Sequence, residues 1–191
     1  MEMVRGKDSL RKKLLEKLLS LTRDEIERRS IDVARNLSGV ALYKKAKVIM
    51  AYYPLKGEVD IRELLKKAME EKRVCFPVIN VENRQLIPYM VKDLERDFRK
   101  GPYGVMQPDK ERTVRVQHSE IDVVITPGLA FAQDKNRLGR GAGYYDRFLK
   151  GLTGKTTIIG VAFDFQVVSC LPASPSYDVK VDILVTETRI L

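Results

Sequence analysis

IDVVITPG, residues 121–128, combines an almost entirely apolar run with an abrupt end at Pro127 and Gly128. Continuous apolar character without polar alternation is typical of a parallel strand that is covered on both faces. Proline and glycine break the strand period, so they are expected to end the segment. This stretch therefore predicts a parallel sheet at the centre of the protein.

Similar strand-like runs occur on both sides of this segment, and helical stretches separate several of them. The runs are KVIMAYY, VCFPVI, LIPYMV, TIIGVAF and VDILVT, at residues 47–53, 74–79, 86–91, 157–163 and 181–186. This alternation predicts an α/β layer fold with a largely parallel sheet flanked by helices. Because such sheets bind ligands beyond the carboxyl ends of their strands, the loops after Tyr53, Thr126 and Phe163 are the expected place for a site.

Two helices are predicted before the first strand. Leucines recur with helical spacing between Lys7 and Ser20, and Thr22 with Glu25 has the spacing of a capping box that opens a second helix, which ends near Gly39. A further helix is expected from Asp60, with Glu63 in its first turn, to about Lys72. The glycine- and proline-rich stretch GPYGVMQP, residues 101–108, predicts an ordered loop.

Composition indicates a globular protein that stays in the cytosol. The chain has 191 residues, of which 44% are hydrophobic and 32% are charged, and no apolar run approaches the roughly 20 residues needed to cross a bilayer. The amino-terminal residues lack the apolar core of a secretory signal. Cys75 and Cys170 are far apart without metal-binding spacing, so no structural disulfide is expected.

The net charge of +9 favours anionic partners, which could be nucleic acid, nucleotide phosphates or a polycarboxylate ligand. Charge alone does not choose among them. Lysine and arginine mostly alternate with aspartate and glutamate along the helical stretches, which is also typical of a solvated, ion-paired surface.

The glycine-rich string RLGRGAGYYD, residues 137–146, is the most informative part of the chain. Its three alternate glycines can turn backbone N–H groups inward before a helix, which is how phosphate is often bound. Arg137 and Arg140 add guanidinium groups, and Asp146 is placed to hold Mg²⁺ beside the phosphates. The spacing fits neither the Walker pattern nor a dinucleotide-binding fingerprint. A tight connection with solvated arginines is the alternative interpretation.

This string and several shorter ones resemble the 5-formyltetrahydrofolate cyclo-ligase family over nearly the whole chain. The matching segments are ITPGLAF, NRLGRGAGYYDRFL, GVAF, LPASP and VKVD, at residues 125–131, 136–149, 160–163, 171–175 and 179–182. Lys7 and Arg11 match the family's basic first helix, and Glu58 matches an acid after the first strand. The resemblance implies one cyclo-ligase domain over residues 1–191, with a fold like that of sugar-phosphate isomerases and CoA-transferases (NagB, RpiA).

The resemblance also implies roles for particular residues. Those expected to bind ATP are Lys7, Arg11, Arg137, Leu138, Gly139, Arg140, Gly141, Ala142, Gly143, Tyr144 and Tyr145. Those expected to bind the folate substrate are Tyr53, Glu58, Tyr103, Arg140 and Tyr144, of which Arg140 and Tyr144 would be catalytic. The metal ligands would be Asp146 and Asp182. The chain departs from the family pattern at Gln107, Ala142 and Tyr177.

The implied activity is the conversion of 5-formyltetrahydrofolate to 5,10-methenyltetrahydrofolate, with ATP as co-substrate and Mg²⁺ as cofactor. The expected protein is a cytoplasmic monomer with no nucleic-acid or membrane partner. Two alternatives stay open. An isomerase or CoA-transferase relative would use a carboxylate base without ATP, and a basic RNA-binding protein would lose affinity steeply with salt.

Overall fold

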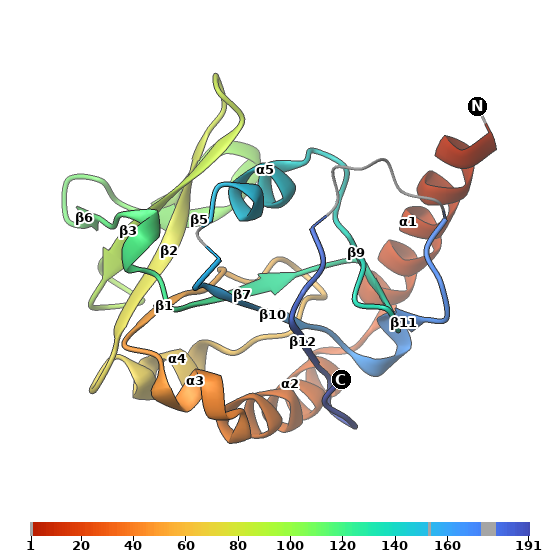
Figure 1. Cartoon of the computed structure of the whole chain (residues 1–191), viewed down its shortest axis with the longest axis horizontal. Coiled ribbons are helices and arrows are strands. Elements are labelled where there is room, and N and C mark those ends of the chain that lie inside the picture. The colour runs from red at the N-terminus through yellow and green to blue at the C-terminus, as the bar shows by residue number, and fades with distance from the viewer. Residues whose placement is uncertain (1, 153, 173–178) are drawn as a thin grey trace.

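The protein is described here by a computed structural model that covers residues 2–152, 154–172 and 179–191. Its centre is a seven-stranded sheet in the order β12-β10-β7-β1-β2-β3-β6 (Figure 1). The strands are β1 (Val48–Met50), β2 (Arg73–Asn80), β3 (Gln85–Val91), β6 (Val114–Arg115), β7 (Val123–Pro127), β10 (Thr157–Val161) and β12 (Ile183–Val185). The five strands from β12 to β2 are parallel, while β3 and β6 are antiparallel additions. The predicted α/β fold with a largely parallel sheet is confirmed.

The segment IDVVIT supplies β7, and its position explains its composition. β7 lies between β10 and β1, and Val123, Val124 and Ile125 are all buried. Because β7 is covered on both faces, apolar side chains are stable on either side of it.

Helices cover both faces of the sheet, as Figure 1 shows. They are α1 (Glu2–Ser20), α2 (Arg23–Gly39), α3 (Ala41–Lys45), α4 (Arg62–Ala68) and α5 (Tyr144–Lys150). Residues of α2, α3 and α4 share one apolar core with Ile49 and Ile125. On the opposite face, Phe148 and Leu149 of α5 pack with Val124. The result is a three-layer α/β/α arrangement.

The amino-terminal helices agree only partly with the prediction. The Thr22 hydroxyl accepts the Glu25 N–H at 3.2 Å, and the Glu25 carboxylate accepts the Thr22 N–H at 2.9 Å, so the capping box is confirmed. Three helices precede β1 rather than two, because the short α3 follows α2 directly. The helix predicted from Asp60 begins at Arg62 and ends at Ala68.

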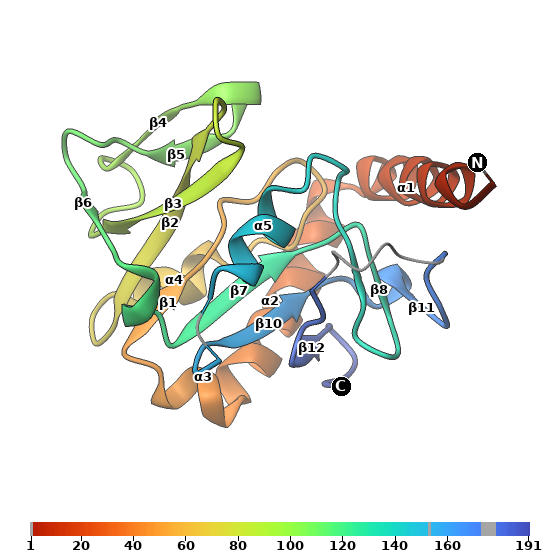
Figure 2. The ribbon, with the colours of Figure 1, turned by 45° about the horizontal axis from the view of Figure 1, so that its top comes forward.

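The prediction of a loop over residues 101–108 is confirmed for residues 101–105 and wrong for residues 106–108, which form a strand. Strands β4 (Phe98–Lys100) and β5 (Met106–Pro108) form an antiparallel hairpin, whose tip is the 3-10 turn Pro102–Gly104. Figure 2 shows this hairpin lying over β2 and β3. The strands were missed because each is only three residues long, too short for a periodic signal.

A second small sheet also was not predicted. Strands β8 (Ala130–Ala132), β9 (Arg137–Leu138) and β11 (Val167–Val168) pair in the order β11-β8-β9. α1 projects from the body of the molecule in Figure 2 and packs on this sheet through Leu14, which contacts Ala130 and Leu138. The β8–β9 hairpin thereby sets the first helix beside the start of the glycine-rich string.

The two cysteines and the length of the helices bear on the remaining expectations. Cys75 is buried in β2, Cys170 is exposed, and both are free thiols. Among the helices of the described chain, none combines the length and the apolar character that crossing a bilayer requires.

Candidate active site

A cavity of about 310 Å³ lies beyond the carboxyl ends of β1 and β7, where a parallel sheet is expected to bind its ligand. The loops after Tyr53 and Thr126 contribute to it, but Phe163 does not line it, because the chain after β10 turns instead toward β11. Its walls are mostly apolar, with charge at one side. The lining residues are Tyr52, Tyr53, Leu55, Glu58, Phe76, Pro77, Ile79, Leu86, Tyr103, Val105, Met106, Pro127, Gly128, Arg137, Gly139, Arg140, Ala142, Gly143, Tyr144, Tyr145 and Asp146.

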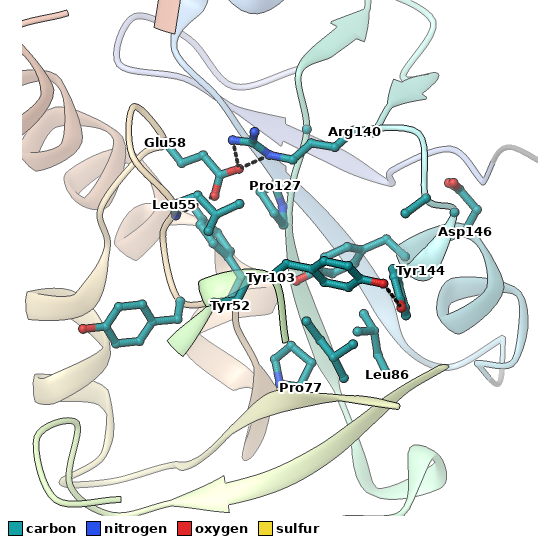
Figure 3. A pocket seen from close by; sticks show the side chains of 18 of the residues that line it. Tyr52, Leu55, Glu58, Pro77, Leu86, Tyr103, Pro127, Arg140, Tyr144 and Asp146 are labelled. Atoms are coloured by element: carbon teal, nitrogen blue, oxygen red, sulfur yellow. Dashed lines mark hydrogen bonds and ion pairs between the residues drawn. The ribbon is translucent and has the colours of Figure 1, made fainter. Parts of the chain in front are cut away.

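Glu58 and Arg140 form an ion pair at the charged side of the cavity, as Figure 3 shows. Glu58 Oε1 accepts from Arg140 Nε at 3.0 Å and from Nη2 at 2.8 Å. Glu58 Oε2 accepts the N–H of Leu55 at 2.9 Å, which fixes the carboxylate in its loop. The Glu58 side chain is only 9% exposed, whereas that of Arg140 is 36% exposed. The structure thus brings together an acid expected at the folate and an arginine expected at the phosphates.

Arg137 and Asp146 form a second ion pair at the cavity wall. Arg137 Nη2 donates to Asp146 Oδ1 at 2.5 Å, and Nη1 donates to the carbonyl of Pro127 at 3.2 Å. The Arg137 side chain is 2% exposed, and its guanidinium lies 5.5 Å from the centre of the Tyr145 ring. Arg137 is therefore buried and bonded within the protein, so the alternative of a solvated arginine is wrong for this residue, whereas its expected contact with ATP stays a prediction.

The glycine-rich segment contacts the first helix through Arg11, a residue that the resemblance implied as an ATP ligand. Arg11 Nε donates to the carbonyl of Gly139 at 3.1 Å. Gly141 and Gly143 have positive φ angles of 104° and 68°, a conformation that residues with a Cβ rarely adopt. Lys7 is buried in the same helix, one turn before Arg11. The loop is thus held from α1 on one side and continues into α5 on the other.

Tyr103 and Tyr144 meet across the cavity mouth, with their hydroxyl oxygens 3.4 Å apart (Figure 3). Tyr103 is 73% exposed and has a φ of 57°, which is unusual for a residue other than glycine. The hydrogen bond with Tyr103 raises the pKa of Tyr144. Burial raises the pKa of the neighbouring Tyr145. Tyr144 therefore stays protonated near neutral pH and can act as a hydrogen-bond donor.

Tyr53 lies in the cavity wall, but its hydroxyl is directed toward α4. It accepts from Arg62 Nη1 at 2.9 Å, and its ring packs on Phe98 at 5.0 Å. Arg62 is itself held by Asp60, whose pKa is lowered because the hydrogen bonds and charge of Arg62 outweigh the effect of burial. Tyr53 therefore offers a ring surface to the cavity rather than a donor.

The structure does not bring Asp182 into the cavity. Its Oδ2 accepts the N–H of Ile158 at 2.7 Å and so fastens the start of β12 to β10. Within the described residues, no group of three or more potential metal-binding side chains occurs. Asp146 lines the cavity, so any Mg²⁺ there would depend on phosphate oxygens and water as well. Tyr177, one of the departures from the family pattern, lies outside the described residues.

Several apolar wall residues were not predicted from the sequence. Phe76, Pro77 and Ile79 come from β2, and Leu86 comes from the start of β3. They read as ordinary strand residues, so only the tertiary arrangement shows that they face a cavity. Tyr52 also lines it, with its hydroxyl donating to the Val59 carbonyl at 2.6 Å.

Together these features define an α/β protein with a cavity at the carboxyl edge of its parallel sheet, bordered by a basic glycine-rich loop. Residues 3–187 match the sequence pattern of the 5-formyltetrahydrofolate cyclo-ligase family. The chain belongs to this family.

Known members show how far the similarity extends. The solved structure of Aquifex aeolicus 5,10-methenyltetrahydrofolate synthetase is 38% identical, with a TM-score of 0.84 over 96% of this chain and 91% of that one. The Mycoplasma pneumoniae 5,10-methenyltetrahydrofolate synthetase structure is 26% identical, with a TM-score of 0.74 over 95% and 98%. The mouse 5-formyltetrahydrofolate cyclo-ligase is 27% identical over 93% of this chain and 91% of its own.

Proposed function

We propose that this protein converts 5-formyltetrahydrofolate to 5,10-methenyltetrahydrofolate, using ATP and releasing ADP and phosphate. Family membership supports the reaction, because the relatives carry the name of this ligase. The observation that carries the site assignment is the contact between Glu58 and Arg140 at one cavity. It joins the residue expected at the folate to the residue expected at the transferred phosphoryl group.

The cavity would hold the pterin ring rather than the whole folate. Its volume of about 310 Å³ lies at the lower end of the roughly 300–1,000 Å³ typical of small-molecule sites. Apolar walls suit the flat faces of the ring. The carboxylate of Glu58 suits its amino and ring N–H edge, because an ionised acceptor forms a strong hydrogen bond to such donors.

The glycine-rich loop would bind the triphosphate of ATP. Residues 139–143 follow a buried strand and include Arg140, and Arg11 contacts Gly139. In this arrangement the 5-formyl oxygen would attack the γ-phosphorus, and ADP would leave. N10 would then attack the activated carbon, the carbon–oxygen bond would break to release phosphate, and the N10 proton would pass to solvent.

Arg140 would stabilise the charge that spreads over the transferred phosphoryl oxygens, since such reactions depend on positioning and on nearby cations. Tyr144 would donate a hydrogen bond that orients the formyl group. Asp146 would be the protein ligand of Mg²⁺, which usually binds one or two carboxylates together with substrate phosphates. When bound, Mg²⁺ would supply positive charge to the phosphates.

We expect substrate binding to break the Glu58–Arg140 ion pair and to give each of the two residues a new partner. While its Nε and Nη2 donate to Glu58, Arg140 has only part of its guanidinium left for the γ-phosphate, so it could not bind that group with its Nε–Nη2 edge. A pterin bound to Glu58 would compete for that carboxylate and release the guanidinium. Folate and ATP would thereby each favour the binding of the other. Once the first ligand has broken the ion pair, the second ligand binds without having to break it again.

The rival functions have less support. An isomerase-like enzyme needs a carboxylate base available to its substrate, yet Glu58 and Asp146, the two acids that line the cavity, each bind an arginine.

We further expect the enzyme to act in the cytoplasm as a monomer. Its partners would be the two small molecules, with no nucleic-acid or membrane partner. Its elution volume in size-exclusion chromatography tests the oligomeric state.

Turnover tests the proposed function. The purified protein is mixed with 5-formyltetrahydrofolate, ATP and Mg²⁺, and the near-ultraviolet absorbance of the methenyl product is followed. We expect absorbance to grow only when ATP is present, with one ADP formed per product. No absorbance change under these conditions would reject the assignment.

A further inference from the structure

Arg147 joins two parts of the molecule that are distant in sequence. It lies in α5, one turn after Gly143, and it does not line the cavity. Its Nη2 donates to the carbonyl of Ala142 at 2.7 Å, and its Nε donates to the carbonyl of Arg84 at 2.8 Å. Ala142 belongs to the glycine-rich loop, whereas Arg84 is in the turn that joins β2 to β3. The side chain therefore ties that loop to the β2–β3 hairpin.

The guanidinium of Arg147 also packs closely on the loop backbone and on Tyr144. A Cβ placed on Gly143 would lie 2.9 Å from Arg147 Nη1, so a larger residue at 143 would require the guanidinium to shift. The centre of the guanidinium is 5.6 Å from the centre of the Tyr144 ring. Tyr144 is thus held through its ring by Arg147 and through its hydroxyl by Tyr103.

The backbone at the Arg84 acceptor adopts an unusual conformation. Arg84 has a φ of 49°, a conformation uncommon for residues other than glycine, asparagine and aspartate, and its carbonyl accepts from Arg147. Non-glycine residues in such conformations are found where the surrounding structure holds them. The planar guanidinium suits two carbonyls in different directions, whereas a lysine presents a single point charge.

We propose that Arg147 is a positioning residue for the reaction. It holds the Ala142–Gly143 backbone at a fixed distance from the β2–β3 turn and presents the Tyr144 hydroxyl to the cavity. This inference rests on the proposed function, since Tyr144 is the group through which Arg147 would act. Arg147 itself contacts neither substrate, so its loss is expected to lower kcat more than it raises either KM.

A double-mutant cycle tests this role, because it measures whether two residues act as one unit. The variants are Arg147→Gln, Tyr144→Phe and the combination. We expect Arg147→Gln alone to lower kcat about 10- to 100-fold, which corresponds to roughly 1.4–2.7 kcal/mol at a factor of ten per 1.36 kcal/mol. In the Tyr144→Phe background the same change is expected to lower kcat less than threefold. Equal losses in both backgrounds would overturn the proposal.

Arg84→Asn is the matched control. It removes a nearby positive charge but keeps the accepting carbonyl, and asparagine tolerates the backbone conformation. We expect its kcat to stay within threefold of wild type. A loss as large as that of Arg147→Gln would show that charge near Tyr144 matters, rather than the bridge.

Amide hydrogen exchange of the ligand-free protein separates this inference from the proposed function. Arg147→Gln is expected to speed exchange in residues 139–146 and to leave β7 and β10 unchanged, because the side chain is exposed and outside the core. If the wild type showed no turnover, this result would still support the bridge while rejecting the reaction. Unchanged exchange in an active enzyme would reject the bridge alone.

Discussion

The two arginines of the glycine-rich string differ in what surrounds them, although they look equivalent in sequence. Arg137 is 2% exposed and bonded to Asp146 and a main-chain carbonyl, whereas Arg140 is 36% exposed and bonded to Glu58. Removing a buried arginine leaves its acid unpaired and costs much stability, whereas Arg140 is partly hydrated in its pair with Glu58. We therefore assign a structural role to Arg137 and a role in the reaction to Arg140.

Arg140→Ala is expected to lower kcat by about a thousandfold or more, in the range seen for arginines that stabilise phosphoryl transfer. Its free energy of unfolding should fall by less than that of Arg137→Ala, because solvent reaches the Arg140 site and can partly hydrate the Glu58 carboxylate that loses its partner. Steady-state kinetics and urea unfolding measure the two effects. Arg96→Ala, at a residue whose side chain is 81% exposed, is the control. Wild-type activity in Arg140→Ala would exclude the proposed role.

Arg137→Ala should behave in the opposite way with respect to stability. Removal of a buried partner is expected to cost roughly 3 kcal/mol, at the lower end of the usual range because Asp146 keeps contact with solvent. Urea unfolding of the ligand-free protein measures this cost without reference to activity. If Arg137→Ala and Arg140→Ala had equal free energies of unfolding, the buried Arg137–Asp146 pair would not have the stabilising role that we assign to it.

Glu58→Gln is expected to raise the KM for folate about 10- to 100-fold, since a hydrogen bond to a charged group contributes roughly 1.5–3 kcal/mol. The KM for ATP should stay the same or fall, because Arg140 is no longer held by a carboxylate. Glu63→Gln, at an acid whose side chain is 86% exposed, serves as the control. Unchanged folate affinity combined with a raised KM for ATP would contradict the placement of Glu58.

The sequence named both members of the Glu58–Arg140 pair but not their contact. They are 82 residues apart, and no local pattern connects them. For Asp182, the family resemblance suggested a partner that the structure does not bring near it. Asp182 was expected to bind a metal, but its carboxylate accepts a hydrogen bond from the backbone of β10. Residue identity can be read from a motif, but partners depend on the tertiary fold.

At the scale of elements, the β4–β5 hairpin brings Tyr103 over the cavity at a cost in backbone strain. Tyr103 has a φ of 57° and is 73% exposed, so neither its backbone nor its burial explains the choice of tyrosine. Contact with a ligand would explain it. The hairpin thus resembles a loop tip selected for binding rather than for stability.

Tyr103→Asn should separate these contributions. Asparagine tolerates positive φ, so stability should be unchanged or rise by up to about 1 kcal/mol. The KM for folate should rise by about tenfold, since an aromatic contact is lost. Thermal unfolding measures the stability, and steady-state kinetics measure the KM for folate. A folate KM within twofold of wild type would remove Tyr103 from the site.

Long elements with strong periodicity were predicted well, and short ones were not. The capping box of α2 and the buried strand β7 both follow from local sequence. By contrast β4, β8 and β9 span only two or three residues and owe their existence to pairing with neighbours. Such pairing depends on the arrangement of the chain in three dimensions.

At the scale of the whole molecule, the three layers bury Cys75 in the core on β2. Burial raises the pKa of its thiol to about 12, so it stays protonated and unreactive at pH 8. We expect a thiol reagent to label Cys170 quickly and Cys75 only when the protein unfolds. Folate with ATP should slow Cys75 labelling further, because ligands stabilise the folded state. Labelling of both thiols at similar rates would contradict the packing of β2.

The central claim is that one cavity joins the folate and nucleotide sites through Glu58 and Arg140. A crystal structure with 5-formyltetrahydrofolate, Mg²⁺ and a non-hydrolysable ATP analogue tests it most directly. We predict the pterin edge on Glu58, the triphosphate on residues 139–143, and Arg140 moved from Glu58 to the phosphates. A nucleotide bound elsewhere, or an intact Glu58–Arg140 pair with both ligands present, would contradict the claim.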